Sequence, residues 1–262
     1  MPTGEIQEIL DASRDRVNHA ARRLFPHKDV PSAQALKNLY GAWFEKTLTI
    51  VTWNAAHDFN VRNPRKRRVI VPLPDSQTLK FWHLFDEDAQ DKLEQGLFAG
   101  MSACGISMTM SNPDFICVSL DDEAMYNAHF SREVPSVSAA RLQALENTYN
   151  NLKNRCSYKS FVFGLSVKTE LRPDRRYQII YEGSIFKALL SHLVMRYWDK
   201  DIKMKYYGLS LVPPTAGDAR VMTNPSIDSL ISVWVEPRRA VDEMVSCSTI
   251  AEVKRVLRRW LD

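Results

Sequence analysis

The chain has 262 residues, of which 45% are hydrophobic and 25% charged, as in ordinary folded globular proteins. Its formal net charge of +4 allows a nucleic-acid partner but is too small to require one. The N-terminus lacks a basic-then-apolar signal, and no apolar run approaches the roughly 18 residues of a membrane span. The four cysteines show no CxxC spacing, which favours free thiols in a reducing compartment. We therefore expect a soluble intracellular protein.

The first hundred residues are predicted to be mainly helical. Apolar residues recur at helical spacing over 3–25, with Thr3 as a possible cap, and over 33–58, which Ser32 can cap. A short strand is expected over 69–71, and a further helix begins near residue 76 and runs to about 98.

The remainder of the chain alternates between short apolar runs and helical patterns. Residues 121–135 are polar and are expected to be irregular. Thr249 and Glu252 form a capping box for the last helix. The predicted strands are 115–118, 161–167, 203–212 and 230–235, and the predicted helices are 136–154 and 178–198. With no repeat or linker, we expect one α/β domain over 1–262, divided into a helical part (1–100), a core (101–235) and a C-terminal helix (236–262).

A buried strand ends on a charge at Lys168. A lysine in this position is costly unless an anion meets it. Arg172, Asp174 and Arg175 follow within a few residues. Arginine presents a rigid donor pair to guanine O6 and N7, and aspartate accepts from cytosine N4. The stretch predicts phosphate contact at Lys168 and readout of G·C pairs just after it; a surface salt-bridge cluster at a strand-to-helix turn is the alternative.

Three charged side chains stand at predicted strand ends or on the helix that follows: Asp114, Lys168 and Glu182. Hydrolysis of a phosphodiester needs a metal that polarises the phosphate and activates water. Mg²⁺ prefers one or two carboxylates together with waters and substrate oxygens, which Asp114 and Glu182 can supply. Lys168 can hold the attacking water or offset charge in the transition state.

Pro113-Asp114 followed at a distance by Ser166-Val167-Lys168 resembles the PD-(D/E)XK nuclease superfamily. Ser166 departs from the motif, because that position should be acidic. One branch of type II restriction endonucleases, whose members cut around a CCGG core, shares this departure. In that branch the carboxylate comes from the following helix, 13 or 14 residues after the lysine, and Glu182 lies 14 residues after Lys168.

The same branch carries an Arg-x-Asp-Arg recognition element, which Arg172, Asp174 and Arg175 match with Pro173 as the variable residue. It also has a glutamate on an earlier helix, which Glu45 matches by position alone; a helix-surface role is the alternative for Glu45. The specific similarity covers 113–114 and 161–190.

The resemblance implies a restriction-endonuclease-like α/β fold, a central mixed β-sheet flanked by helices. It implies Mg²⁺-dependent double-strand cleavage of DNA at a palindrome containing CCGG, by a homodimer, a tetramer or a dimer formed on DNA, in the cytoplasm of a prokaryote. The resemblance assigns Asp114, Ser166, Lys168, Glu182 and Glu45 to catalysis, with Asp114 and Glu182 as metal ligands. Alternatives are a CCGG-binding protein without cleavage and a relative that recognises CC and GG around a central pair; the spacing of the recognition element favours an uninterrupted CCGG.

A basic loop precedes the first predicted strand. It can contact DNA phosphates or the minor groove, or it can simply be solvated. Its basic residues are Arg62, Arg65, Lys66, Arg67 and Arg68. Other enzyme classes find no support, since the phosphate-loop, dinucleotide, GxSxG and HExxH motifs are all missing from the sequence.

Overall fold

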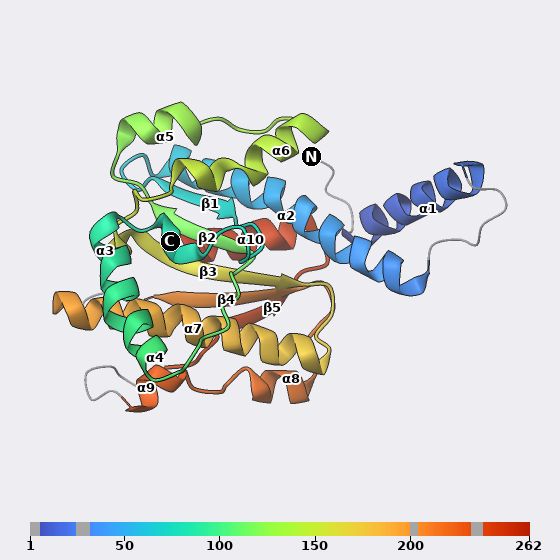
Figure 1. The fold of residues 1–262 in the computed structure, drawn as a ribbon. Helices are drawn as coiled ribbons and strands as arrows, with labels where there is room; N and C mark the ends of the chain where they lie inside the picture. The colour runs from blue at the N-terminus through green and yellow to red at the C-terminus, as the bar shows by residue number, and fades with distance from the viewer. Residues whose placement is uncertain (1–5, 25–31, 200–203, 232–237) are drawn as a thin grey trace.

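The computed structural model describes residues 6–24, 32–199, 204–231 and 238–262. A five-stranded sheet in the order β1-β2-β3-β4-β5 lies at its centre (Figure 1). The pairs β1/β2 and β2/β3 are antiparallel, whereas β3/β4 and β4/β5 are parallel. The sheet is therefore mixed, as the resemblance to the nuclease family implied. Its strands are β1 (Arg68–Pro72), β2 (Phe115–Ser119), β3 (Phe161–Lys168), β4 (Lys205–Ser210) and β5 (Glu243–Ser246).

Helices cover both faces of this sheet (Figure 1). The α-helices are α1 (Ile6–Leu24), α2 (Ala33–Arg62), α3 (Glu87–Asp91), α4 (Ala99–Ala103), α5 (Glu123–His129), α6 (Ala139–Glu146), α7 (Pro173–Tyr197), α8 (Ala216–Val221), α9 (Ile227–Ile231) and α10 (Ile250–Leu261). Short 3₁₀ segments (Phe81–Leu84, Thr148–Asn151, Tyr158–Ser160) and a π-helical segment (Lys92–Phe98) complete the helical structure of the described residues. None of the helices described is both long and apolar enough to cross a membrane.

Two apolar cores result from the alternation of side chains along the strands. On β2, Phe115 and Cys117 pack with residues of α1, α2 and α10. Ile116 and Val118 point the other way, into a core shared with α7 and the segments between 79 and 98. Because both faces are buried, the strands have near-continuous apolar runs, which made them visible in the sequence.

Most of the predicted elements are confirmed, within a few residues at their ends; the predicted cap Thr3 and the predicted strand start at residue 203 lie outside the described residues. The Ser32 hydroxyl accepts from the Ala35 amide at 3.2 Å and begins α2, which continues four residues beyond its predicted end. The capping box of Thr249 and Glu252 begins α10. The strands expected over 69–71, 115–118, 161–167 and 203–212 correspond to β1 to β4.

Three predictions in the middle of the chain need correction. The helix expected over 76–98 is broken, because the backbone is extended at Lys80 and Phe85 and the Asn112 side chain accepts from the Phe81 amide at 3.0 Å. The segment 121–135 contains α5, which Asp122 caps by accepting from the Met125 amide at 2.9 Å. The helix expected over 136–154 ends at Glu146 and gives way to a 3₁₀ turn.

The C-terminal part differs in two further respects. The strand predicted over 230–235 is wrong at its start, since residues 230 and 231 belong to α9; 232–235 lie outside the described residues. The segment 236–262 holds a strand, β5, in addition to the expected helix. β5 is half-buried and has only two apolar residues, Met244 and Val245, between Glu243 and Ser246, so it lacks the longer apolar run by which the other strands were recognised.

Candidate active site

Asp114, Ser166 and Lys168 meet where β2 begins and β3 ends. Residues two apart on a strand point to the same face, so Ser166 and Lys168 lie side by side. The Asp114 Oδ2 atom accepts from the Lys168 Nζ at 2.9 Å and the Val167 amide at 2.6 Å, and the Ser166 Oγ lies 3.2 Å from it. The anion that a lysine at the end of a buried strand requires is therefore Asp114, 54 residues away in sequence.

Glu182 reaches this cluster from α7. The Ser166 hydroxyl lies 2.8 Å from Glu182 Oε2 and 3.2 Å from Asp114 Oδ2, so a single oxygen contacts both carboxylates. The hydroxyl of the buried Tyr206 on β4 donates to Glu182 Oε2 at 3.0 Å. Ser111 and Gln178 donate to Oε1 at 2.7 and 2.8 Å. Glu182 is almost completely buried, and both of its oxygens are fixed.

α7 approaches the sheet closely enough to make these bonds because of Gly183. A Cβ atom at this position would lie 2.4 Å from the Ala240 carbonyl oxygen and 2.9 Å from the Tyr206 ring. The backbone carbonyl cannot yield as the end of a flexible side chain would. A glycine beside Glu182 is thus a requirement of the packing that places this carboxylate.

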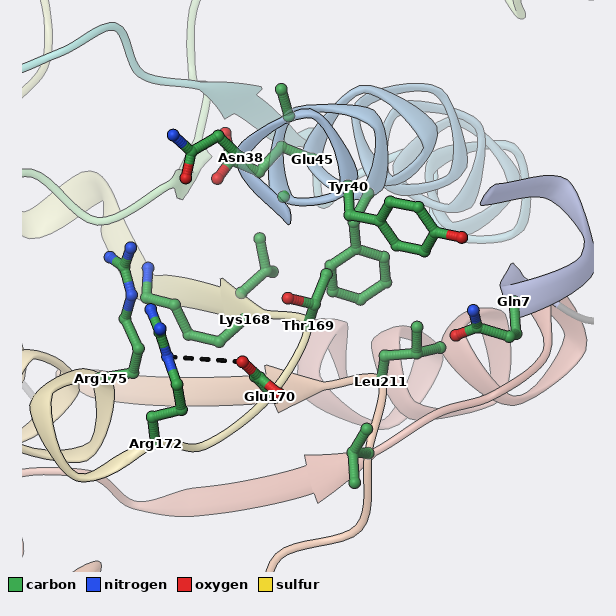
Figure 2. Close-up of a pocket in the computed structure, with 15 residues that line it drawn as sticks. Gln7, Asn38, Tyr40, Glu45, Lys168, Thr169, Glu170, Arg172, Arg175 and Leu211 are labelled. Atoms are coloured by element: carbon green, nitrogen blue, oxygen red, sulfur yellow. Dashed lines mark ion pairs between the residues drawn. The ribbon is translucent and has the colours of Figure 1, made fainter. Parts of the chain in front are cut away.

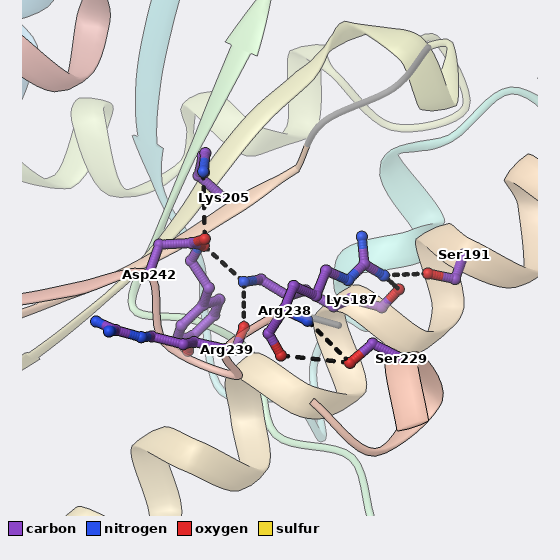
Figure 3. A network of polar contacts seen from close by, with 8 residues as sticks. Lys187, Ser191, Lys205, Ser229, Arg238, Arg239 and Asp242 are labelled. Atoms are coloured by element: carbon purple, nitrogen blue, oxygen red, sulfur yellow. Dashed lines mark hydrogen bonds and ion pairs between the residues drawn. The ribbon is translucent and has the colours of Figure 1, made fainter. Parts of the chain in front are cut away.

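A buried ion pair fixes the same helix five residues after Glu182 (Figure 3). The fully buried Lys187 ammonium donates to the Asp242 carboxylate at 2.6 Å and to the Arg239 carbonyl at 2.5 Å. Asp242 also accepts from the Tyr206 amide at 2.7 Å. Removing one partner of such a pair costs about 3–5 kcal/mol. The network holds α7 and β4 together, and with them Glu182 and Tyr206.

The electrostatics keep Lys168 cationic. Burial lowers the pKa of its ammonium, but the carboxylates of Asp114, Glu182 and Glu45 outweigh burial and leave the pKa above its ordinary value. The group is therefore charged at neutral pH. It can stabilise negative charge or orient water, and it is not suited to act as a base.

Glu45 joins the cluster from the opposite wall. It lies on α2 and faces Lys168 and Arg175 across a cavity of about 440 Å³ (Figure 2). A second cavity of about 370 Å³ has both Glu45 and Asp114 in its wall. Although the Glu45 side chain reaches solvent in this open cleft, burial and the Asp114 carboxylate raise its pKa to about 7. The structure thus brings all five predicted catalytic residues together.

The recognition element lies in the first turn of α7 rather than in a turn before it. The predicted start at residue 178 is wrong: Pro173 occupies the first helical turn, where a missing amide hydrogen costs nothing. Arg172 and Asp174 are exposed, and Arg172 lies 3.4 Å from Glu170 and 3.7 Å from Asp174. Arg175 is half-buried beside Lys168 (Figure 2). The element therefore follows β3, and its two arginines, Arg172 and Arg175, line the cavity.

The basic loop is at the other end of the sheet. Arg68 pairs with Ser119, whereas Pro72 pairs with Phe115 beside Asp114. The two ends of this ladder are four residue steps apart, about 13 Å. Arg67 forms an ion pair with Glu123 at 2.6 Å, and Arg68 stacks over the Phe59 ring. Arg62 donates to a helix carbonyl, and Arg65 and Lys66 are exposed. The structure does not bring this loop to the catalytic cluster, and DNA contact by it remains a prediction.

The donor set suits a hard divalent cation. Asp114 and Glu182 offer carboxylate oxygens linked by one hydroxyl, and Mg²⁺ takes few protein ligands, all oxygen. Among the residues described, no group of three or more His, Cys, Asp or Glu side chains forms a ready-made metal cage. This is compatible with an ion that keeps waters and binds together with substrate oxygens.

Comparison of the sequence with known proteins identifies the family of this chain. The family profile "Cfr10I/Bse634I restriction endonuclease" matches residues 1–262. This chain belongs to that family of restriction endonucleases. It is 25% identical over 260 residues to the type II restriction enzyme Cfr10I of Citrobacter freundii. The aligned region covers 97% of this chain and 87% of Cfr10I.

The fold of this chain is also similar to two solved structures of Bse634I. The crystal structure of type IIF restriction endonuclease Bse634I with cognate DNA superposes with a TM-score of 0.90 and 27% identity, covering all of this chain and 88% of that one. A second structure of Bse634I gives a TM-score of 0.89 at the same identity and coverage. The restriction-endonuclease fold predicted from the sequence is confirmed.

Three residues that hold Glu182 in this restriction endonuclease were not predicted: Ser111, Gln178 and Tyr206. Gln178 lies three residues after Arg175 and four before Glu182, a helical spacing that would have indicated it had α7 been started at Pro173. Ser111 and Tyr206 come from a loop and a strand, and no spacing in the sequence relates them to Glu182.

We expect Glu45→Gln to change the pH dependence of stability of this restriction endonuclease without metal or DNA. A carboxyl group with a raised folded-state pKa contributes stability that is lost as pH rises from about 4.5 to about 7. Glutamine removes that loss. The Tm of the variant minus the Tm of the wild type should therefore be larger at pH 8 than at pH 5. The gain should be at most about 2–4 °C, because the side chain reaches solvent. Melting in EDTA at both pH values measures it, with the exposed Glu8→Gln as control; an identical difference at both pH values would contradict the prediction.

Proposed function

We propose that this restriction endonuclease hydrolyses both strands of DNA, with Mg²⁺, at a palindrome that contains an uninterrupted CCGG. The observation that carries the proposal is the Ser166 hydroxyl, which contacts the carboxylates of Asp114 and Glu182 beside the Lys168 ammonium. Metal-dependent phosphodiester hydrolysis uses oxygen ligands for the metal and a positive charge near the phosphate, and the two carboxylates and the lysine ammonium can supply these.

Each side chain of the cluster has a distinct role in this proposal. Asp114 and Glu182 would hold Mg²⁺, which when bound polarises the phosphate and activates water. Lys168 remains an ammonium, so it orients the attacking water or neutralises developing charge at the phosphate. The Ser166 Oγ lies between the two carboxylates, within 3.2 Å of both, and can donate its proton to one of them at a time. Glu45, with its pKa of about 7, can exchange a proton at the far wall of the cleft near neutral pH.

The recognition element supports the CCGG core. Arg172 and Arg175 would donate to the edges of guanines in the major groove, and Asp174 would accept from cytosine amino groups. Thymine presents an acceptor at the equivalent position, so Asp174 would reject it. Because the element begins four residues after Lys168, a misplaced base displaces the catalytic strand end as well.

A palindromic site also implies two-fold symmetry of the enzyme. We propose a homodimer on DNA, either alone or as half of a tetramer, because each half-site needs its own recognition element. We further propose that it works in the cytoplasm of a prokaryote, where the four free thiols would stay reduced.

The direct test is digestion of unmethylated plasmid or phage DNA with Mg²⁺ or with EDTA, followed by sequencing of the ends. Discrete fragments that end in a CCGG-containing palindrome, formed only with Mg²⁺, are expected. A Lys168→Ala preparation purified in parallel serves as control for contaminating nucleases. Specific binding to CCGG duplexes without cleavage would instead assign a binding protein, and ends at a site with a central pair would assign an interrupted core. The absence of both binding and cleavage would overturn the proposal.

A further inference from the structure

A continuous hydrogen-bonded chain on α7 joins the recognition element to the catalytic cluster. The Arg175 Nη1 donates to Gln178 Oε1 at 2.9 Å, and the Gln178 Nε2 donates to Glu182 Oε1 at 2.8 Å. The three residues follow one another at helical spacings of three and four, so they lie along one side of the helix. The Gln178 amide thus uses its oxygen toward Arg175 and its nitrogen toward Glu182.

The three other donors to Glu182 lie outside α7, on two strands and a loop. Tyr206 and Ser166 are on β4 and β3, both are fully buried, and both bond Oε2. Oε1 has two donors among the described contacts, Ser111 from the loop before β2 and Gln178. Of these four donors, only Gln178 is itself bonded to a residue of the recognition element in the part of the chain that the structure describes.

We propose that Gln178 is a positioning residue that makes the placement of Glu182 depend on the placement of Arg175. The inference rests on the proposed function, in which Arg175 contacts guanine and Glu182 holds the metal. A guanidinium has five N–H donors, so Arg175 can bond both guanine acceptors and still donate to Gln178. A wrong base draws Arg175 away, the Gln178 amide loses its anchor, and Oε1 loses one of its two donors.

The amide orientation is essential to this mechanism. Gln178 must accept from Arg175 and donate to Glu182, and an amide is the side chain that does both at once at this length. A glutamate at 178 would still accept from Arg175 but could not donate to Glu182 while ionised. A leucine would fill a similar volume and make neither bond.

The test compares Gln178→Leu and Gln178→Glu with wild type and with Tyr181→Phe. Tyr181 lies on the same helix, and its hydroxyl donates to the Thr109 carbonyl at 2.6 Å; the hydrogen bonds described for Glu182 do not include it. Two quantities are measured: affinity for a CCGG duplex in EDTA, and the single-turnover cleavage rate with Mg²⁺ at saturating duplex. Melting temperatures establish that each variant is folded.

Both Gln178 variants should bind the CCGG duplex within about threefold of wild type and cleave it about tenfold or more slowly, the effect of losing one hydrogen bond to a charged group. Tyr181→Phe should match wild type in both. Wild-type cleavage rates in both Gln178 variants, or equal losses of affinity and rate, would overturn the positioning role. If Gln178→Leu does not fold, the affinity and cleavage rate of Gln178→Glu alone test the positioning role. Failure of the wild type to bind and cut CCGG would overturn the proposed function, a separate result.

Discussion

Lys168→Ala and Asp114→Ala should each reduce cleavage at least about a thousandfold while sequence-specific binding persists. Removing a single preorganised group that meets developing charge commonly costs two to three orders of magnitude. Here each substitution also leaves its partner without its 2.9 Å contact. The recognition element lies on α7, outside the replaced residues, so binding to CCGG should remain.

Two measurements separate this outcome from misfolding. Affinity for a CCGG duplex and for a duplex with one changed core pair, both in EDTA, should show retained discrimination. Lys254→Ala on α10, which removes a lysine 3.9 Å from Asp58 and remote in sequence from the cluster, should cut normally. Near-normal cleavage by either active-site variant would refute the assignment of the site.

That Asp114, Ser166, Lys168 and Glu182 come together was predictable from the sequence. A lysine that ends a buried strand needs an anion, and Pro113-Asp114 was the motif that offered one. The resemblance to the nuclease branch pointed to the second carboxylate, Glu182, and the structure places this residue on α7 beside Ser166. Glu45 was placed by position only, yet α2 carries it to the wall of the same cavity.

What the sequence concealed depends on contacts between distant segments. Tyr206 bonds Glu182 because β4 lies parallel to β3, and no local pattern encodes this pairing. The break in the helix expected over 76–98 depends on the Asn112 side chain, which bonds the backbone of residues 79 and 81. The basic loop was considered for its charge, and only the register of β1 against β2 shows that it lies at the opposite end of this strand pair from Asp114.

Arg175→Ala should abolish discrimination in binding itself, before any chemistry. A bidentate arginine contact to guanine contributes about 1–3 kcal/mol, so affinity for CCGG should fall about 10–100-fold and approach the affinity for a changed core. Arg175→Lys keeps the charge but loses the planar donor pair, and it should retain much of the salt-dependent binding without the preference. Competition between cognate and altered duplexes at fixed salt measures both. Preserved discrimination in Arg175→Ala would remove this residue from the recognition element.

An Arg65→Ala variant tests whether the position of Arg175, and not only its charge, determines sequence discrimination. Arg65 is an exposed arginine of the basic loop at the opposite end of the β1–β2 ladder from Asp114. If that loop touches DNA, it touches phosphates, and its loss should weaken binding to all duplexes alike and reduce the salt dependence by about one unit of slope. Arg175 should behave in the opposite way, because it lines the cavity and, in the proposed function, donates to guanine edges rather than to phosphates. One arginine then affects which sequence is bound, and the other affects only how tightly.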